Sequence, residues 1–188
     1  MTIPLIEEQP HLRILIRNRV RQLLKEGVKI NERVYCSRPL PVFTDELPVC
    51  LIYFTNEDAE HKNTAPRVYT RKLTLVTEVL HNIGETERET GLDDYLDSRA
   101  FEIEYALGSD RYLGLPEVVQ DTILVRTEPI NLGFEGDRTC ASVRLFWEIT
   151  YVTSFNYQGS LDEFLKFNTK YNLENGAKAE DMVTIRTA

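Results

Sequence analysis

The sequence has few cysteines, few histidines and no long apolar run. Its 188 residues include three cysteines, Cys36, Cys50 and Cys140, which form no CxxC motif and no Cys/His pair at metal-ligand spacing. No stretch approaches the roughly 20 apolar residues that a membrane span requires. The first ten residues, MTIPLIEEQP, lack the basic start and apolar stretch of a signal peptide. We therefore expect no zinc site, no membrane partner and synthesis in a reducing, cytoplasmic compartment.

Positive charge is also in short supply. The chain has 22 Lys and Arg residues against 30 Asp and Glu residues, a net charge of −8. A dedicated nucleic-acid-binding domain needs clustered Lys and Arg against phosphates, and docking on an anionic membrane needs the same. The balance argues against both classes. The length suits one domain, or one domain with an appendage, that buries a core without a metal or disulfide.

Motifs for catalysis are missing as well. The sequence contains no GxSxG, no glycine-rich phosphate loop and no HExxH. His61 has acids nearby at Glu57, Asp58 and Glu60, but a flexible polar segment would not preorganise metal ligands. Asp93, Asp94 and Asp97 are explained more simply as acids at a helix start, where the helix dipole favours them. We expect a protein that is not an enzyme and has no cofactor or metal.

What is present first is an amphipathic segment. Residues Pro10–Glu26 carry an apolar stripe at helical spacing, formed by Leu12, Leu15, Ile16, Val20, Leu23 and Leu24. Arg13, Arg17, Arg21 and Lys25 recur every four residues, which predicts a basic row on the opposite face. Pro10 suits the first turn, and Gly27 suits a left-handed C-terminal cap.

Strand patterns and a second helix follow. We predict an exposed, mobile polar loop over Asn56–Pro66. We also predict a strand that Pro129 interrupts and that therefore lies at an edge or carries a bulge, and a helix from Leu92 to Gly108 with Glu102 and Glu104 on its exposed side. The predicted strands are Arg33–Cys36, Val49–Phe54, Arg67–Leu80, Thr122–Leu132 and Thr139–Thr153, the last with strict apolar alternation. This order predicts an α+β fold: a mixed, mainly antiparallel β-sheet with two helices packed on one face, plus a C-terminal arm.

The character of the chain changes after Ser154. We assign residues 1–154 to the α+β domain and residues 155–188 to the arm, with a short helix over Leu161–Lys170 and a terminal strand over Met182–Arg186. Aromatic residues gather in this arm, which is typical of an interface; the alternative is ordinary core packing with a closely packed tail. The aromatic residues are Phe155, Tyr157, Phe164, Phe167 and Tyr171.

Short stretches across residues 10–154 resemble one known family. Besides the first helix, they are Tyr35–Pro39 (YCSRP), Val42–Tyr53 (VFTDELPVCLIY), Leu73–Val79 (LTLVTEV), Leu92–Arg99 (LDDYLDSR) and Trp147–Tyr151 (WEITY). In this order they resemble the tail terminator proteins of long-tailed phages, the lambda-type minor tail protein family. The arm goes beyond the short form of that family.

The resemblance implies a structural protein of the virion neck, assembled in the host cytoplasm. It implies a homohexameric ring on the last ring of tail tube protein, which stops tail polymerisation and presents the surface that joins the head-tail connector. The arm would embrace the neighbouring subunit or reach the sheath of a contractile tail. DNA would pass through the lumen without specific binding, and six copies at −8 give roughly −48 per ring, a charge that repels phosphate.

A closed ring needs two different complementary faces on each subunit. We expect one face at Arg13, Arg17 and Arg21 and the other at Asp93, Asp94 and Asp97, with Phe155 and Tyr157 of the arm also at the subunit interface. The contact with the tube or neck is expected at Glu57, Asp58, Glu60, His61, Lys62 and Arg67.

Two other functions remain open from the sequence. One is another neck or head-completion connector protein. The other is a small α+β ligand-binding domain or enzyme, with the polar segment as a lid. A deep pocket with convergent polar groups would favour the last of these.

Overall fold

A computed structural model describes residues 11–30, 33–38, 42–64, 66–83, 91–135, 138–155, 166–172 and 178–184. The chain divides into two compact units, Met1–Ser154 and Phe155–Ala188. The elements of the first unit are α1 (Leu12–Gly27), β1 (Val34–Cys36), the 3₁₀ turn η1 (Thr44–Glu46), β2 (Val49–Thr64), β3 (Arg67–Ile83), α2 (Gly91–Gly108), β4 (Val119–Glu135) and β5 (Arg138–Phe155).

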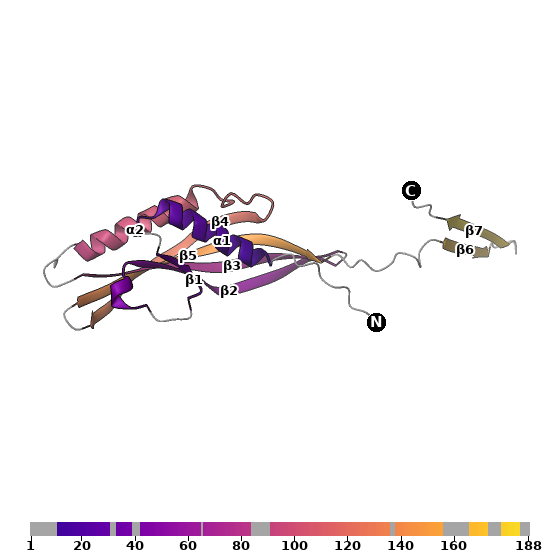
Figure 1. Ribbon diagram of the computed structural model, residues 1–188. Coiled ribbons are helices and arrows are strands. Elements are labelled where there is room, and N and C mark those ends of the chain that lie inside the picture. Colours follow the sequence, from indigo (N-terminus) through magenta and orange to yellow (C-terminus); the bar gives the residue numbers. More distant parts are fainter. Residues whose placement is uncertain are drawn as a thin grey trace. The chain divides into compact units, whose positions relative to one another are not determined.

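The five strands form one sheet in the order β1-β2-β3-β5-β4. β1 pairs with β2 in parallel, whereas β2 with β3 and β4 with β5 are antiparallel hairpins. α1 and α2 lie on the same face of this sheet (Figure 1). The α+β class with a mixed, mainly antiparallel sheet is therefore confirmed. Pro129 lies in β4, an edge strand of the sheet, as the sequence predicts.

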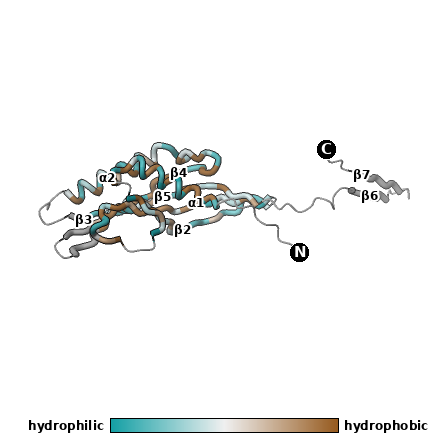
Figure 2. Tube along the Cα trace, in the orientation of Figure 1, coloured by the Kyte–Doolittle hydropathy of each residue, from teal (hydrophilic) through white to brown (hydrophobic). Residues whose placement is uncertain are grey.

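The core lies between the helices and the sheet. Ile16, Val20 and Leu24 of α1 are buried, and the alternating apolar residues predicted in the last strand are buried too. Those residues are Ala141, Val143, Leu145, Trp147, Ile149 and Tyr151. The Trp147 indole N–H donates to Thr77 Oγ1 at 3.3 Å, so the largest core side chain also satisfies its polar atom. Figure 2 shows hydrophobic and hydrophilic residues alternating along these elements.

Gly27 does not form the left-handed cap that the sequence predicts. The helix includes Gly27 and ends in extended backbone at Val28, whose N–H donates to Leu24 O at 3.0 Å. A Cβ on Gly27 would lie 3.0 Å from Cβ of Ala106 in α2. The glycine is needed because the two helices approach closely here, not because the backbone turns.

The predicted loop over Asn56–Pro66 is wrong. β2 continues through these polar residues to Thr64, and β3 begins at Arg67, so only the tip of the hairpin is a turn. The register runs from Val49↔Leu80 to Thr64↔Arg67 with two irregularities, near Phe54 and near His61. Pairing with a well-patterned partner strand extends β2 although its own side chains are exposed, because the ladder satisfies the backbone.

The helix predicted over Leu161–Lys170 is also wrong where it can be tested. In the second unit, Lys166–Asn172 form strand β6, which pairs antiparallel with β7 (Lys178–Thr184). β7 overlaps the predicted terminal strand. The stretch KFNTKYN contains Asn, Thr and aromatic residues, which have low helix propensity, and a partner strand begins six residues after its end. Tyr157, Leu161–Leu165 and Ile185–Arg186 lie outside the described residues.

Within the described part of the chain, neither helix has the combination of length and hydropathy that crossing a membrane requires.

Candidate subunit interface

The two helices lie over opposite edges of the sheet. α1 contacts β1, which is one edge strand, whereas α2 contacts β3 and β4, and β4 is the other edge strand. The two helices also contact each other above the sheet. The first unit therefore has a β1-side edge flanked by α1 and a β4-side edge flanked by α2.

The basic row of α1 lies beside the buried stripe and not opposite to it as predicted. A helix turns about 100° per residue, so each step of four residues advances by about 40° beyond a full turn. Arg13 and Arg17 consequently lie nearer to the core face than Arg21 and Lys25 do, although Arg13, in the first turn, keeps 44% of its side chain exposed. Arg13 Nη1 lies 3.3 Å from Glu57 Oε2, and Arg17 Nη1 donates to Ser37 Oγ at 3.1 Å. The row thus holds α1 against the β1-side edge.

Next to this row is a depression of about 290 Å³. It is lined by His11, Arg13, Ile14, Arg17 and Phe54. Phe54 stands on β2 beyond Ile52, the last residue of β2 that pairs with β1, and Arg17 lies over the Phe54 ring at 5.8 Å from its centroid. The lining of the depression thus combines two apolar side chains with two arginines beside α1.

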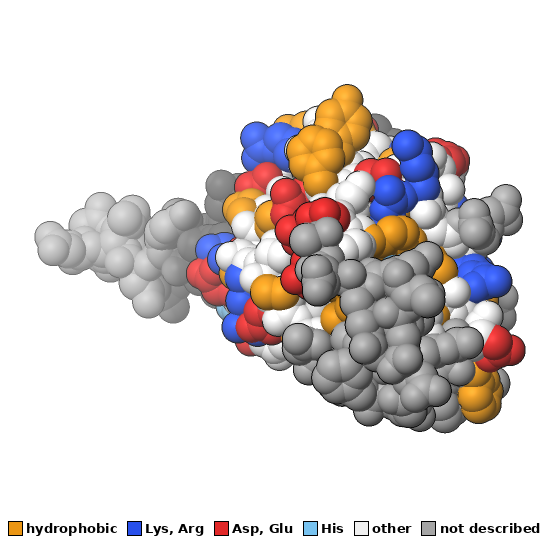
Figure 3. Space-filling model, turned by 90° about the vertical axis from the view of Figure 1, so that its left-hand side faces the viewer, with side chains coloured by type: hydrophobic (Ala, Val, Ile, Leu, Met, Phe, Trp, Pro, Cys, Tyr) orange, Lys and Arg blue, Asp and Glu red, His pale blue; other side chains and the backbone are white. Residues whose placement is uncertain are grey.

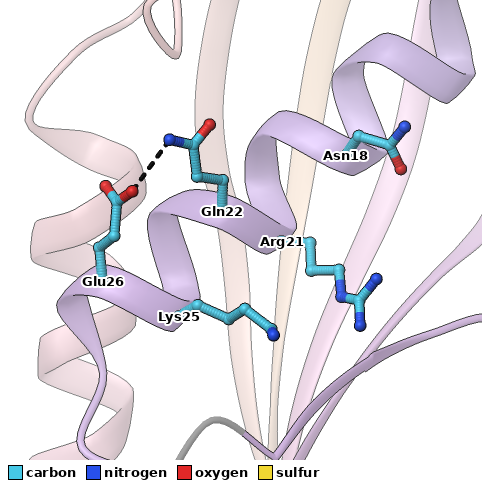
Figure 4. A pocket seen from close by; sticks show the side chains of 5 residues that line it. All are labelled: Asn18, Arg21, Gln22, Lys25 and Glu26. Carbon is cyan, nitrogen blue, oxygen red and sulfur yellow. Dashed lines mark hydrogen bonds between the residues drawn. The ribbon is translucent and has the colours of Figure 1, made fainter.

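A second hollow follows the outer surface of α1 further along. It is lined by Asn18, Arg21, Gln22, Lys25 and Glu26, all of which project from the helix (Figure 4). Gln22 Nε2 donates to Glu26 Oε1 at 2.9 Å, and Arg21 Nε donates to Val34 O at 3.3 Å. The lining comes from a single exposed helix face, so it offers charge for a contact but no enclosed site.

The predicted acids of α2 are exposed. Asp93, Asp94 and Asp97 lie outside the buried stripe of this helix. Glu102 and Glu104, expected to be exposed, are half-buried. Glu102 Oε2 accepts from the Lys29 N–H at 2.9 Å on the α1 side, and Glu104 Oε1 meets Thr127 Oγ1 of β4 at 3.5 Å.

These two contacts fix the orientation of α2. Glu104 faces the β4-side edge. Because a helix turns about 100° per residue, Asp93 and Asp97 project from nearly the same side of α2 as Glu104 and lie on that flank too. The flank of α2 over the β4-side edge is therefore acidic, whereas the flank of α1 over the β1-side edge carries the basic row.

Sequence reasoning missed two aromatic residues on α2. The Phe101 and Tyr105 side chains are 68% and 72% exposed, one helical turn apart. Ile123 and Val125 of β4 are exposed as well. Figure 3 shows hydrophobic side chains protruding at the top of its view, at the height of the helices in Figure 1. The sequence contains a signal for this exposure, because Phe101 and Tyr105 are aromatic residues outside the buried stripe that starts at Leu92.

The residues predicted to contact the tube or neck lie on strands. Asp58, Glu60, His61 and Lys62 are exposed on β2, and Arg67 is exposed at the start of β3. Lys62 Nζ lies 2.7 Å from Glu60 Oε1, and this hydrogen bond lowers the pKa of Glu60. The rings of His61 and Tyr69 are 5.3 Å apart. The hairpin presents these side chains in a fixed strand register.

Glu57 differs from the other five because it faces inward. Its side chain is 12% exposed, and its carboxylate accepts a hydrogen bond from the Tyr151 hydroxyl on β5. Arg13 of α1 and Arg71 of β3 flank it, with Arg71 Nη1 at 3.4 Å from Oε2. Burial and the bond to Glu57 raise the pKa of Tyr151. Glu57 thus holds the end of the core together and is not available as a contact residue.

A second carboxylate is buried on the sheet face away from the helices. Glu78 accepts from Tyr53 Oη at 2.9 Å and from Ser142 Oγ at 3.0 Å, and Arg144 Nε lies 2.8 Å away in an ion pair without linear hydrogen-bond geometry. Burial and the Glu78 hydrogen bond raise the pKa of Tyr53 to about 12. The two hydroxyls donate hydrogen bonds to the carboxylate and Arg144 balances its charge, so the cluster ties β2, β3 and β5 together.

No family model and no curated protein matches the chain.

Among the described residues, no group of three or more His, Cys, Asp and Glu side chains is placed to hold a metal ion. Burial raises the pKa of the Cys50 thiol to about 12 and that of the Cys36 thiol above its usual value, which keeps both protonated and unreactive near neutral pH. Phe155 ends β5 with an exposed side chain, whereas Tyr157 and the Cys140 side chain lie outside the description.

Proposed function

We propose that the chain is a phage tail terminator: a virion structural protein that forms a ring on the end of the tail tube, ends its polymerisation and provides the surface for head joining. One observation carries the proposal beyond the resemblance of residues 10–154. A basic flank and an acidic flank lie over opposite edges of a single sheet.

That placement suits a cyclic assembly. A ring is built from heterologous contacts, in which one face of each subunit meets a different face of the next. Arg21 and Lys25 at one edge and Asp93 and Asp97 at the other supply charges of opposite sign for such a contact. A two-fold dimer would instead need a self-complementary patch, and either flank by itself would repel its own copy.

The β2–β3 hairpin suits the contact with the tube or neck. Its distal part carries exposed charges of both signs, Asp58, Glu60, Lys62 and Arg67, and a strand ladder holds them in register. Side chains on a regular strand are held in more precise positions than side chains on an irregular loop. Such a pattern of charges suits a specific contact with the last ring of tube subunits.

Charge reversal tests the proposed ring. Arg21→Glu and Asp93→Lys should each abolish the rings of six that we expect mass measurement and electron microscopy to detect for the wild type on tube ends. The two changes in one chain should restore them, because the contact is then made with the charges exchanged. Glu117→Lys, an exposed residue between α2 and β4, serves as a control that leaves ring formation intact.

The function itself is read out by tail length. Tube protein polymerised with the chain should give capped tubes that stop growing, whereas tubes without it should continue to elongate. Rings that bind a neck component but never a tube end would instead support a connector protein. A chain that forms no ring and leaves tube growth unchanged would sink the proposal.

A further inference from the structure

The most exposed apolar side chains of the described domain need a partner. Phe101 and Tyr105 stand on the outer side of α2, where a soluble helix ordinarily carries polar residues. Asp97 lies one turn before Phe101 and Glu104 lies three residues after it, so both acids share its side of the helix. An aromatic side chain flanked by carboxylates is thus presented towards the β4-side edge.

The opposite edge has the complementary chemistry. The depression is lined by two apolar side chains, Ile14 and Phe54, and by two arginines, Arg13 and Arg17, besides His11. Arg13 is 44% exposed despite its ion pair with Glu57, which leaves part of its guanidinium accessible to a second carboxylate. Ile14 is 40% exposed, so its apolar side chain is accessible to a partner.

We propose that Phe101 of one copy inserts into this depression on the next copy, with Asp97 and Glu104 meeting Arg13 and Arg17 in its lining. The occupant is a second copy of this chain, since the apolar knob and its acids match the two apolar side chains and the arginines of the depression on the opposite edge. The contact is head to tail, so each copy uses its knob and its depression at once. This inference rests on the proposed ring and specifies its contact.

Two single substitutions separate the two halves. Phe101→Asp removes the knob and Ile14→Asp spoils the depression, and both residues are exposed enough for the fold to tolerate the change. Each variant alone should associate at least about 30-fold more weakly than the wild type, the loss expected for an aromatic hot spot. Ser109→Asp, two turns after Phe101, and Leu15→Asp on α1 add the same charge at exposed positions outside the contact and should associate as the wild type does.

Mixing provides the decisive measurement. A one-to-one mixture of Phe101→Asp and Ile14→Asp contains one intact knob and one intact depression per pair, so sedimentation should detect dimers and nothing larger. Wild-type rings together with a mixture that stays monomeric would overturn this contact and leave the proposed function standing. Head-to-tail dimers in the mixture, with a wild type that never caps a tube, would overturn the function and leave the contact standing. A wild type that remains monomeric even on tube ends would overturn both.

Discussion

The carboxylate of Glu57 on β2 accepts a hydrogen bond from the hydroxyl of Tyr151 on β5, reaching past the intervening strand β3. Arg13 from α1 and Arg71 from β3 contact the same carboxylate. One acidic side chain therefore joins the helix layer to three strands at the end of the core. Because the Glu57 side chain is only 12% exposed, these partners are needed to compensate for the loss of water around its charge.

Removing the charge of Glu57 should lower stability measurably. Glu57→Gln keeps the shape but leaves two arginines without their carboxylate, and we expect a loss of about 1–3 kcal/mol in the free energy of unfolding. Tyr151→Phe should cost about 1–2 kcal/mol by the same reasoning. Urea unfolding of both variants and the double variant gives the coupling energy, which should be at least 0.5 kcal/mol as for residues in one network, roughly estimated. Strict additivity would contradict the direct bond.

Glu57 also shows where sequence reasoning reached its limit. The segment around it is polar, so its local pattern resembles a loop, and what makes it a strand is pairing with β3, which is information held elsewhere in the chain. The alternation of β5 and the apolar stripes of both helices were predictable because each element buries one face along its own length. The inward turn of one acid in a polar run depends on Tyr151, which lies 94 positions later.

The interface residues divide in the same way. Arg13, Arg17 and Arg21 are recognisable as a row, but the 40° drift per step decides which of them reach solvent, and that requires knowing which stripe is buried. Phe101 could have been found as an apolar residue outside the stripe. The depression that Ile14 and Phe54 share could not, because those two residues belong to separate elements that only the fold brings together.

The close approach of the helices predicts a second effect. Gly27→Val should destabilise the fold by about 1–3 kcal/mol, because a side chain at 3.0 Å from Ala106 Cβ must push α1 and α2 apart. Ala106→Gly in the same chain should recover part of the loss by vacating the space. Gly108 offers the matched control, since nothing lies within 4 Å of a Cβ there and Gly108→Val meets no neighbour. Equal losses at both glycines would show that backbone freedom, not packing, is responsible.

Alkaline pH should weaken the fold through Tyr53. Its pKa is raised to about 12 in the folded protein by burial and by the Glu78 carboxylate, whereas an unfolded tyrosine titrates near 10. The stabilisation is therefore complete below about pH 10 and is lost as the pH rises towards 12, because the unfolded chain releases the proton first. Urea midpoints should fall over this interval, and less steeply in Tyr53→Phe. Tyr105→Phe, at an exposed position, should retain the wild-type slope; a Tyr53→Phe profile identical to wild type would rule out this residue as the cause.

The distal hairpin should open before the rest of the sheet. Arg71 Nε donates to Thr153 Oγ1 near the end of β5 at 2.8 Å, and four register pairs, from Glu60↔Thr70 to Thr64↔Arg67, extend beyond this contact. A two-stranded ribbon with exposed side chains is only marginally stable in water. Amide hydrogen exchange should therefore show the lowest protection near Thr64 and Arg67, rising towards Leu75 and Val76, which are buried. Protection at the tip equal to that of Leu145 would contradict this gradient. Because the same hairpin is proposed to meet the tail tube, its protection should increase in capped tubes, whereas that of Leu145 should stay constant.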